Sequence, residues 1–259
     1  MAQTRRYATW GGALLGGLLA LLLAAAAHAQ VSQAFHRTIP LPANGRVSLE
    51  NVNGGVEVTG WERDEVQIDA VKQGRDQQRL DEARIEVETG SDSVSIRTRY
   101  PEGQTNNNPA SVHYTLHVPQ HARLDRISLV NGSLTGQQVV GEVDASLVNG
   151  KAHISDLAGQ AKISTVNGGI EANYASLNNV REINLKSVNG SIELGLSGSP
   201  NADVKASTVN GSIKSDFPLT VQGGLVGHNL SSTLGSGGTR IELSNVNGST
   251  HIASGRGSL

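Results

Sequence analysis

Three histidines recur at intervals of four residues, at His113, His117 and His121. On a helix this spacing would place three imidazole rings on one face, where they could bind zinc. Apolar and polar residues alternate over positions 111–118, however, which predicts a strand. Strand residues four apart are separated by about 13 Å, too far to share one metal ion. Pro119 also interrupts the strand before His121. We therefore predict a solvated polar face and no metal ligand.

The sequence also contains no motif for a catalytic nucleophile and no phosphate-binding loop. Serine is abundant, but no Gly-x-Ser-x-Gly motif of the kind that exposes a catalytic serine occurs. The glycine-rich stretches at 223–224 and 235–238 are not followed by the Lys-Ser/Thr pair of a phosphate loop. Carboxylates recur singly, at positions expected to face solvent: Glu57, Glu171, Glu193 and Glu242. We predict no catalytic residue, no cofactor and no enzymatic activity.

The first 29 residues have the features of an export signal. Arg5 and Arg6 precede an uncharged apolar run, and Ala27-His28-Ala29 ends it with small residues where a signal peptidase would cut. The apolar run is shorter than the roughly 20 residues that span a membrane as a helix. We predict a signal peptide over 1–29, Gln30 as the first mature residue, and no membrane span after cleavage.

Charge and composition limit the classes of partner. The chain carries 21 Lys and Arg against 23 Asp and Glu, and loss of Arg5 and Arg6 would make it more acidic. Binding of nucleic acid requires a clustered basic face, so we predict no nucleic-acid partner. The chain has no cysteine, and aromatic residues make up only 3% of it. The core must therefore consist of Val, Ile, Leu and Ala.

An internal repeat dominates the chain. Val-Asn-Gly occurs seven times, with steps of 18 to 22 residues between the copies from Val130 to Val209. A step of 37 residues then leads to Val246, and we expect a degenerate copy within 221–238 to fill it. The Asn and Gly of each copy are the predicted structural corner residues: Asn53, Gly54, Asn131, Gly132, Asn149, Gly150, Asn167, Gly168, Asn189, Gly190, Asn210, Gly211, Asn247 and Gly248.

The residues around each motif valine, numbered zero, follow a fixed pattern. Positions −5, −3, +4 and +6 are almost always Ala, Val, Ile or Leu, whereas positions −4, −2, −1, +3 and +5 almost never are. This pattern predicts two strands joined by a corner and does not fit a helix. One repeat has too few apolar residues to offset its loss of chain entropy, so stability must come from stacking on neighbouring repeats.

Two all-β architectures fit this repeat. In one alternative, Asn-Gly is a type I′ turn within antiparallel β-hairpin repeats that pack as a sandwich. We favour the other, a parallel β-solenoid (a single-stranded β-helix) in which Asn-Gly is a corner and the motif valine turns inward. Glycine would supply an unusual φ at the corner. The corner asparagines would stack and bond to one another along the coil, as ladders do in cross-β structures.

The part of the chain before the main repeats is less regular. We predict that residues 30–121 form a β-region, with a short helix or loop within 73–83, that caps or extends the solenoid. The repeat solenoid itself is predicted over 122–254, and a frayed tail over 255–259. Trp61, the only tryptophan after the signal, is expected to pack over the end of the coil.

The repeated Ser/Thr-Val-Asn-Gly-Ser/Gly-Ile unit, at 165–170, 187–192 and 208–213, resembles a bacterial β-strand-repeat family of unknown function labelled "putative adhesin". The opening Val47-Ser-Leu-Glu-Asn-Val-Asn-Gly-Gly-Val-Glu-Val-Thr-Gly-Trp61 is similar to the N-terminal signature of that family, and Phe217-Pro-Leu-Thr-Val221 is similar to its C-terminal end. The resemblance covers nearly the whole mature chain. It implies a parallel β-solenoid in the cell envelope, and it supplies no catalytic residues.

These features predict an exported, non-catalytic repeat protein of the cell envelope, acting as an adhesin or binding scaffold. Its partner would be an unknown protein or glycan of the envelope. The periplasm is the expected compartment, with the cell surface and the exterior as alternatives. Two other functions stay open. One is a regulatory partner of a membrane sensor of envelope stress. The other is a polysaccharide-acting β-helix enzyme, which would require a charged cluster and aromatic platforms for sugars.

Overall fold

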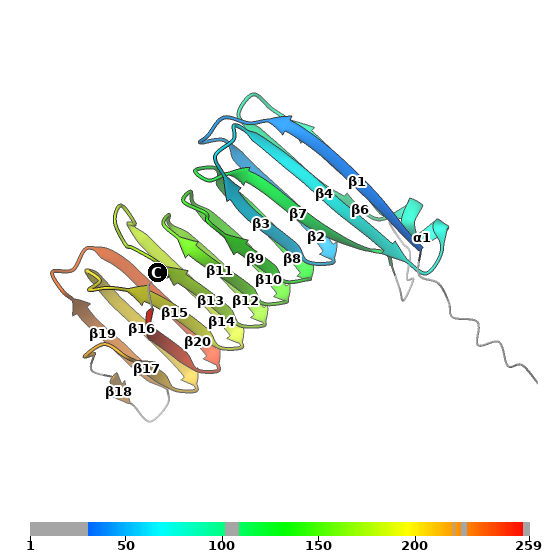
Figure 1. The fold of residues 1–259 in the computed structure, drawn as a ribbon. Helices are drawn as coiled ribbons and strands as arrows, with labels where there is room; N and C mark the ends of the chain where they lie inside the picture. The colour runs from blue at the N-terminus through cyan, green and yellow to red at the C-terminus, as the bar shows by residue number, and fades with distance from the viewer. Residues whose placement is uncertain (1–30, 102–108, 220, 224–226, 256–259) are drawn as a thin grey trace, which may run out of the picture.

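The computed structural model describes residues 31–101, 109–219, 221–223 and 227–255. These residues form two long mixed β-sheets and one short helix, α1 (Gln77–Glu82) (Figure 1). A single continuous cluster of buried, mostly aliphatic side chains runs between the sheets from one end of the stack to the other. The prediction of an all-β fold is confirmed. The core is not made of Val, Ile, Leu and Ala alone, because Tyr114 and Tyr174 are fully buried in it.

The strands follow one another along the stack in a fixed spatial order. Sheet A has ten strands: β1 (Val31–Pro40), β4 (Glu65–Gly74), β7 (Ser111–Pro119), β3 (Val56–Trp61), β9 (Leu134–Gln137), β11 (Ala152–Leu157), β13 (Ile170–Tyr174), β15 (Ile192–Ser197), β21 (Thr250–Gly255) and β17 (Ile213–Ser215). Sheet B has eleven strands: β18 (Val221–Gly223), β19 (His228–Leu234), β16 (Ala202–Asn210), β20 (Thr239–Asn247), β14 (Glu182–Asn189), β12 (Ala161–Asn167), β10 (Val143–Asn149), β8 (Arg123–Asn131), β2 (Arg46–Asn53), β6 (Ser93–Arg99) and β5 (Arg84–Thr89).

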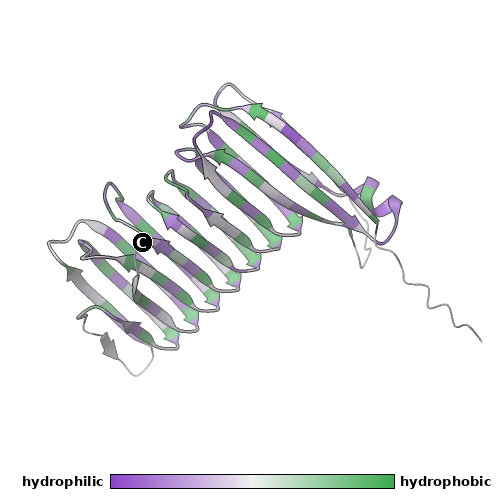
Figure 2. Ribbon diagram, viewed as in Figure 1, coloured by the Kyte–Doolittle hydropathy of each residue, from purple (hydrophilic) through white to green (hydrophobic). Residues whose placement is uncertain are grey.

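Each Val-Asn-Gly copy joins a strand of sheet B to a strand of sheet A, so the chain forms solenoid-like coils. The strand pairs between neighbouring corner-bearing coils are parallel in both sheets. The antiparallel-hairpin alternative is therefore wrong for these repeats, because the two strands that flank each corner lie in different sheets. Figure 2 shows the alternation of apolar and polar residues along the strands that makes this arrangement possible.

The motif valines point outward, which corrects the prediction that they turn inward. Side chains at −5, −3 and −1 are mostly buried, so the alternation of the strand continues to the corner and leaves the valine on the outer face, 36% to 46% exposed. The residue that turns inward is the one at −1, which is polar in five copies: Asn51, Thr165, Ser187, Thr208 and Asn245. Because the inward residue at −1 is polar in these copies, the sequence shows no apolar residue there, and the valine at 0 is wrongly predicted as the next inward residue after −3.

The coils do not follow sequence order at the C-terminal end. Strand β20 lies between β14 and β16, and β21 lies between β15 and β17, so the Val246 coil is inserted between the Val188 and Val209 coils. The prediction of a degenerate coil within 221–238 is also wrong, because the described residues of this segment do not form one. Strand β19 instead runs antiparallel to β16, and β18 runs antiparallel to β19. These two strands form the C-terminal edge of sheet B.

The N-terminal end adds one further layer and then closes the stack. Strand β6 is parallel to β2, and β7 is parallel to β3, so these strands continue the coil beyond the Val52 corner. Strands β5, β4 and β1 are antiparallel to their neighbours. Helix α1 is fixed at both ends, because Asp76 accepts a hydrogen bond from the Arg79 N–H (3.0 Å) and Lys72 Nζ donates to the carbonyls of Leu80 and Ala83.

A bulge in β8 accommodates the one charged residue at an apolar position of the repeat. Asp125 occupies position −5 of the Val130 copy and would point inward in a regular strand. Arg126 adopts a φ of 67°, and the register between β8 and β10 shifts at this point. Leu124 is thereby buried in place of Asp125, which stays exposed.

The described residues include no helix long and apolar enough to cross a membrane. The predicted signal peptide, 1–29, lies outside the described residues, as does most of the predicted tail at 255–259.

Candidate functional site

The corner asparagines lie in one continuous ladder. Each Nδ2 donates to the Oδ1 of the next asparagine at 2.8–3.0 Å, always in the same direction along the stack. The spatial order is Asn53, Asn131, Asn149, Asn167, Asn189, Asn247 and Asn210. Amide ladders of this kind add to the backbone pairing of stacked strands. They hold the corners of the seven coils in line.

The corner glycines are required by close stacking more than by backbone angle. A Cβ added to Gly132 would lie 2.0 Å from the carbonyl oxygen of Gly54, and at the other six corner glycines the nearest carbonyl oxygen would be 1.9 to 2.1 Å away. Only Gly54, Gly168 and Gly248 among the seven have a φ between +20° and +160°. An unusual φ shared by all corners was therefore the wrong expectation, and a column of backbone without side chains is the common requirement.

The buried polar side chains at −1 bond to the corner carbonyls from inside. Thr165 Oγ1 donates to the carbonyl of Gly150 at 3.2 Å, and Asn245 Nδ2 donates to that of Gly190 at 2.7 Å. Ser187 and Thr208 make the equivalent bond to the corner glycine of a neighbouring coil. Asn51 donates instead to the Gly54 carbonyl of its own coil and to the Val112 carbonyl. The donor atoms of these side chains are therefore taken up by backbone carbonyls at the corner. The Oδ1 atoms of Asn51 and Asn245 are buried without a hydrogen-bond partner.

The seven motif valines form a row across the outer face of sheet B, here called the valine row: Val52, Val130, Val148, Val166, Val188, Val246 and Val209 in spatial order. Beside it, position −2 carries serine in five coils, here called the serine row: Ser128, Ser146, Ser164, Ser244 and Ser207. A shallow groove of about 450 Å³ crosses five coils along these rows. A contiguous apolar stripe on an exposed sheet marks an interaction surface.

Several charged side chains around the valine row are paired within the chain. Lys162 Nζ lies 3.4 Å from Asp144 Oδ2, and Lys186 Nζ lies 4.0 Å from Glu242 Oε1. At the N-terminal end, the hydrogen bond from the Arg97 guanidinium to Glu50 (2.9 Å) holds the pKa of that carboxyl below its usual range. The valine row therefore lies in a face whose flanking charges are largely neutralised by neighbours.

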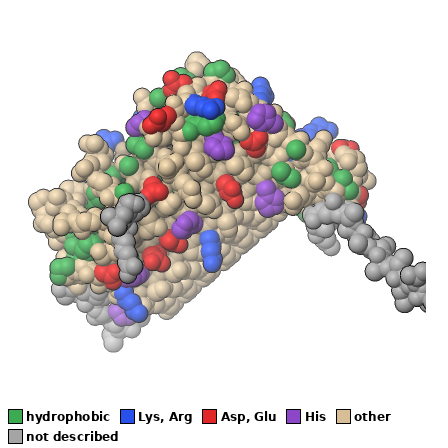
Figure 3. All heavy atoms as spheres, viewed as in Figure 1, with side chains coloured by type: hydrophobic (Ala, Val, Ile, Leu, Met, Phe, Trp, Pro, Cys, Tyr) green, Lys and Arg blue, Asp and Glu red, His purple; other side chains and the backbone are tan. Residues whose placement is uncertain are grey.

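The outer face of sheet A has a different chemical character. Ten side chains in register, one from each strand, form what we call the histidine–acid row: His36, Asp69, Thr115, Glu57, Thr135, His153, Glu171, Glu193, His251 and Lys214. Figure 3 shows histidine and acidic side chains spread over one face of the molecule among uncharged atoms. The row is exposed or half-buried along its whole length.

Contacts between histidine and carboxylate recur along this row. His36 Nδ1 lies 2.6 Å from Asp69 Oδ1, and His153 Nδ1 lies 2.9 Å from Glu171 Oε2. Hydrogen bonds from Gln67 and then from His36 hold the pKa of Asp69 below its usual range. The lowered pKa keeps Asp69 ionised at neutral pH, so it contributes a fixed negative charge to this face.

The C-terminal part of the row has a further carboxylate beside it. Asp216 Oδ1 lies 3.0 Å from His251 Nε2, and Asp216 Oδ2 accepts the Ser254 N–H at 3.0 Å. The contact with His251, followed by that with Ser254, lowers the pKa of Asp216. Glu171 and Glu193 are in register on β13 and β15. Like charges on neighbouring strands repel, and Glu171 is bonded on its other side by His153 and by Asn173 Nδ2.

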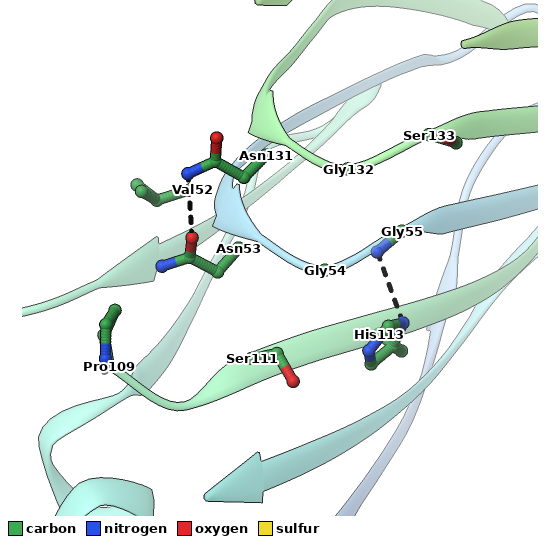
Figure 4. Close-up of a pocket in the computed structure, with 10 residues that line it drawn as sticks. All are labelled: Val52, Asn53, Gly54, Gly55, Pro109, Ser111, His113, Asn131, Gly132 and Ser133. Carbon is green, nitrogen blue, oxygen red and sulfur yellow. Dashed lines mark hydrogen bonds between the residues drawn. The ribbon is translucent and has the colours of Figure 1, made fainter. Parts of the chain in front are cut away.

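A wide hollow of about 950 Å³ lies where the Val52 corner meets β7 (Figure 4). It is lined by residues 52–55 and 131–133, together with Pro109, Ser111 and His113. His113 Nδ1 accepts a hydrogen bond from the Gly55 N–H at 3.3 Å. The lining described here has one imidazole and no carboxylate, so it does not assemble the acid–base pair of a hydrolase.

The histidines that drew attention in the sequence do not converge. His113 and His117 lie on β7, as predicted for a strand, and His121 follows the end of that strand. No group of three His, Asp, Glu or Cys side chains in the described part of the chain has the geometry to hold a metal ion. His117 instead packs on an aromatic ring, that of Trp61.

Trp61 lies on the outer face of sheet A, which corrects the prediction that it covers the end of the coil. Its strand, β3, is followed in the sheet by β7, β4 and β1. The Trp61 ring centroid is 5.2 Å from that of His117, and the Arg63 guanidinium carbon lies 4.8 Å from the Trp61 centroid. Trp61 Nε1 donates to the Glu65 carbonyl at 2.9 Å. The indole is thus held by its own neighbours.

Sequence reasoning missed the valine row, and it found only three carboxylates of the histidine–acid row, Glu57, Glu171 and Glu193, as solvent-facing residues. The signal for the valine row was present, because the valine has the parity of the polar positions −2 and −4 and not that of the apolar positions −3 and −5. The histidine–acid row depends on the register between coils. It also includes His251 from the inserted Val246 coil, and sequence order does not place that coil between its neighbours.

Fold and surface together define a repetitive β-coil protein whose two outer faces carry regular rows of unlike chemistry. Residues 133–253, just under half of the chain, match the family model described as Toastrack DUF4097. This stretch lies within the corner-bearing coils. The match supports the resemblance to a family whose function is unknown. No curated protein matches the chain.

Solved structures of proteins from several bacteria show similarity to this chain. One is a "putative cell adhesion protein" from Clostridium sporogenes, with 15% identity and a TM-score of 0.49, covering 86% of this chain and 100% of that chain. Another is a "putative adhesin" from Bacteroides fragilis, with 12% identity and a TM-score of 0.39, covering 86% of this chain and 97% of that chain. A third, a "putative adhesin" from Parabacteroides merdae, has 10% identity and a TM-score of 0.30, covering 85% and 96%.

Proposed function

We propose that this protein is an exported, non-catalytic binding scaffold of the cell envelope that contacts its partner through the outer face of sheet A. The observation that carries the proposal is the histidine–acid row, in which ten neighbouring strands each present one side chain in register. At a strand spacing of about 4.8 Å, this row extends over about 43 Å. It is long enough to contact a repetitive glycan or an elongated protein surface at many points.

The chemistry of the row suits a partner rich in hydrogen-bond donors or cationic groups. Glu171 and Glu193 repel each other across neighbouring strands, and a donor or cation from a partner would relieve that repulsion. His153 and His251 flank this pair in the same row. The partner would be an envelope protein or an envelope glycan, and the resemblance to adhesins agrees with such a role.

The construction of the coils supports binding with little loss of entropy. Each side chain of the histidine–acid row lies on a strand that is hydrogen-bonded to at least one neighbouring strand. The asparagine ladder holds the corners in position. A surface that is already ordered loses less conformational freedom on association, so its contacts contribute more of their energy to affinity. This supports a scaffold presenting a fixed pattern of groups.

The same proposal assigns a role to each part of the chain. Residues 1–29 would be removed on export, leaving the mature chain in the periplasm, with the cell surface or the exterior as the other destinations. Residues 30–121 would cap the stack. Residues 122–254 would act as a parallel β-solenoid, with the corner asparagines and glycines in a structural role.

A two-stage experiment tests this proposal. Cells expressing a tagged chain are fractionated, and the mass of the recovered protein shows whether residues 1–29 are gone. The purified chain is then incubated with isolated envelope material, alongside Glu171→Gln/Glu193→Gln and a control on sheet B, Asp144→Asn/Glu242→Gln. We expect periplasmic recovery of a cleaved chain. We also expect the sheet A variant to capture at least fivefold less envelope protein or glycan, with the control unchanged.

Three results would count against the proposal. Retention in the cytoplasm with residues 1–29 intact would contradict export. Turnover of an envelope polysaccharide by the purified chain would contradict the non-catalytic role and favour the enzyme alternative. Equal capture by both variants would move the binding surface away from sheet A.

A further inference from the structure

The valine row is an apolar surface with the repeat of the sheet itself. Seven valines, each 36% to 46% exposed, stand on seven neighbouring strands of sheet B, beside the serine row and its groove. Neighbouring valines are separated by the strand spacing of about 4.8 Å. An occupant that contacts all of them must repeat at the same interval.

We propose that the valine row docks on the valine row of a second copy of this chain. A second copy offers the same interval over the same seven coils, so its side chains stay in step from one end of the row to the other. Dry interfaces between stacked sheets are built in this way, by identical side chains that interdigitate. The proposal concerns sheet B and does not depend on what binds sheet A.

The larger side chains of the valine row and the smaller ones of the serine row define how the two copies pack. A twofold axis parallel to the stack, lying between the valine row and the serine row, places the valines of each copy over the −2 side chains of the other. These are serine in five coils and Glu50 and Lys186 in the other two. Such an interface is isologous, because the same patch is used on both sides. Each coil then faces the same coil of the partner copy, and both N-terminal ends lie at the same end of the dimer.

Charge on this face permits self-association. Like faces repel when they carry unpaired charges of one sign, but Asp144 is paired with Lys162 and Glu242 with Lys186. Glu50, which replaces serine beside Val52, is bonded to Arg97. Bringing two copies together therefore does not bring uncompensated like charges into contact.

Other classes of occupant fit the groove less well. Sugar-binding sites present aromatic platforms, and none of the described residues that line this groove is aromatic. An anionic membrane surface would require several free cations around the apolar stripe. Lys162 and Lys186 are paired, which leaves Lys205 at the end of the row as an exposed lysine without an ion pair in the described part of the chain. An extended peptide would add to a sheet edge, not to a sheet face.

The size of the face sets the strength of the association. Six strand steps by four residues give a footprint of about 29 Å by about 13 Å, or roughly 400 Å² on each copy. Stable complexes bury about 800 Å² on each partner. The dimer should therefore be weak and reversible, and populated where the local concentration of the chain is high.

Sedimentation velocity over a concentration series of the purified exported chain tests the inference. The test variant is Val148→Thr/Val166→Thr/Val188→Thr, which keeps β-branching and hence the strand preference but replaces apolar surface with hydroxyl. The matched control is Val71→Thr, because Val71 is equally exposed, at 40%, on the other sheet. We expect the wild type and the control to dimerise with increasing concentration, and the triple variant to require at least tenfold more protein.

A second measurement covers the case in which the triple variant does not fold. The chain has no cysteine, so Val52→Cys and Val209→Cys can be made separately and treated with a short bismaleimide. In the proposed arrangement each variant cross-links to itself.

The inference is overturned if the wild type stays monomeric at every concentration, or if the triple variant dimerises as well as the control. Cross-links that form only when the two cysteine variants are mixed would overturn the parallel arrangement. Binding of phosphatidylglycerol vesicles or purified envelope glycan that is lost in the triple variant, with no dimer in the wild type, would assign the row to that occupant instead.

Discussion

The two outer faces of this molecule are built by the same coils and yet present opposite chemistry. Sheet B shows an apolar row beside small hydroxyls, with its flanking charges paired. Sheet A shows a row of histidines and carboxylates, in which Glu171 and Glu193 lie in register on neighbouring strands. The faces differ because each outward offset from the corner, 0 and −2 on one side and +5 on the other, generates its own row across the stack.

Different positions of the repeat stabilise the fold and form its surface. The inward offsets and the corner Asn and Gly set the stacking, since they form the core and the ladder. The outward offsets are repeated by the same coiling but make no contribution to the core. A change at the corner should therefore affect both faces together, whereas a change at an outward offset should affect one face only.

The largest effect is expected at the corner that both faces share. In Gly150→Ala the new Cβ would lie 1.9 Å from the Gly132 carbonyl oxygen, so the coils must separate. We expect a loss of about 3 kcal/mol in the free energy of unfolding, as for other cases of severe overpacking. Gly55→Ala is the control, because its nearest atom would be 3.4 Å away. Urea denaturation measures both, and equal losses would show that close stacking is not what requires glycine.

The next effect concerns the polar residue that turns inward at −1. Asn245→Ala removes the bond to the Gly190 carbonyl and leaves that acceptor buried, which should cost about 1–3 kcal/mol. The nearby outward substitution Ser244→Ala, at −2, should cost less than about 0.5 kcal/mol. Thermal and urea unfolding of the two variants compare the inward and outward offsets directly. Similar losses for the two would mean that the −1 bond is not a structural part of the corner.

Much of this fold could be predicted from the sequence, because its main determinants are local and repeated. Alternation on both sides of each Val-Asn-Gly gave the strands, and the step of 18 to 22 residues indicated a coil. The polarity of positions −1 and 0 was harder to interpret. Asn51, Thr165 and Asn245 are polar but buried, since each bonds a corner carbonyl, and that bond is visible only once the coils are stacked.

The order of the coils could not be predicted from local patterns. Val246 has the same motif as the other copies, and nothing near it indicates insertion between the Val188 and Val209 coils. The step of 37 residues predicts a degenerate copy of the repeat, whereas it holds β19, which pairs antiparallel with β16. The order of side chains in a row that crosses several coils, such as the histidine–acid row, could not be predicted either, because it depends on which coils are neighbours.

The asparagine ladder should give a smaller effect that depends on position along the stack. Asn167 bonds to an asparagine on each side, whereas Asn210 stands at the end and bonds only to Asn247 within the ladder. Exposed hydrogen bonds contribute about 0.5–1 kcal/mol each. Asn167→Ala should therefore lower the free energy of unfolding by about twice as much as Asn210→Ala. Equal effects in urea denaturation would indicate that the ladder bonds do not contribute separately.

The smallest effect is a pH-dependent one that should be confined to sheet A. Contacts with His251 and the Ser254 N–H hold the pKa of Asp216 below its ordinary value of 3.8. A carboxyl whose pKa is lowered by folding stabilises the folded state fully above the unfolded pKa, and this stabilisation is lost as the pH falls through the folded pKa. Asp216→Asn should therefore lower the Tm by a constant amount near pH 5, and the difference from the wild type should shrink steadily below pH 3.8. Since Asp216 ties β21 to the turn that follows β17, the loss should appear first as faster amide exchange at 250–254. A Tm difference that persists unchanged at pH 3 would show that the side chain acts there by something other than its charge.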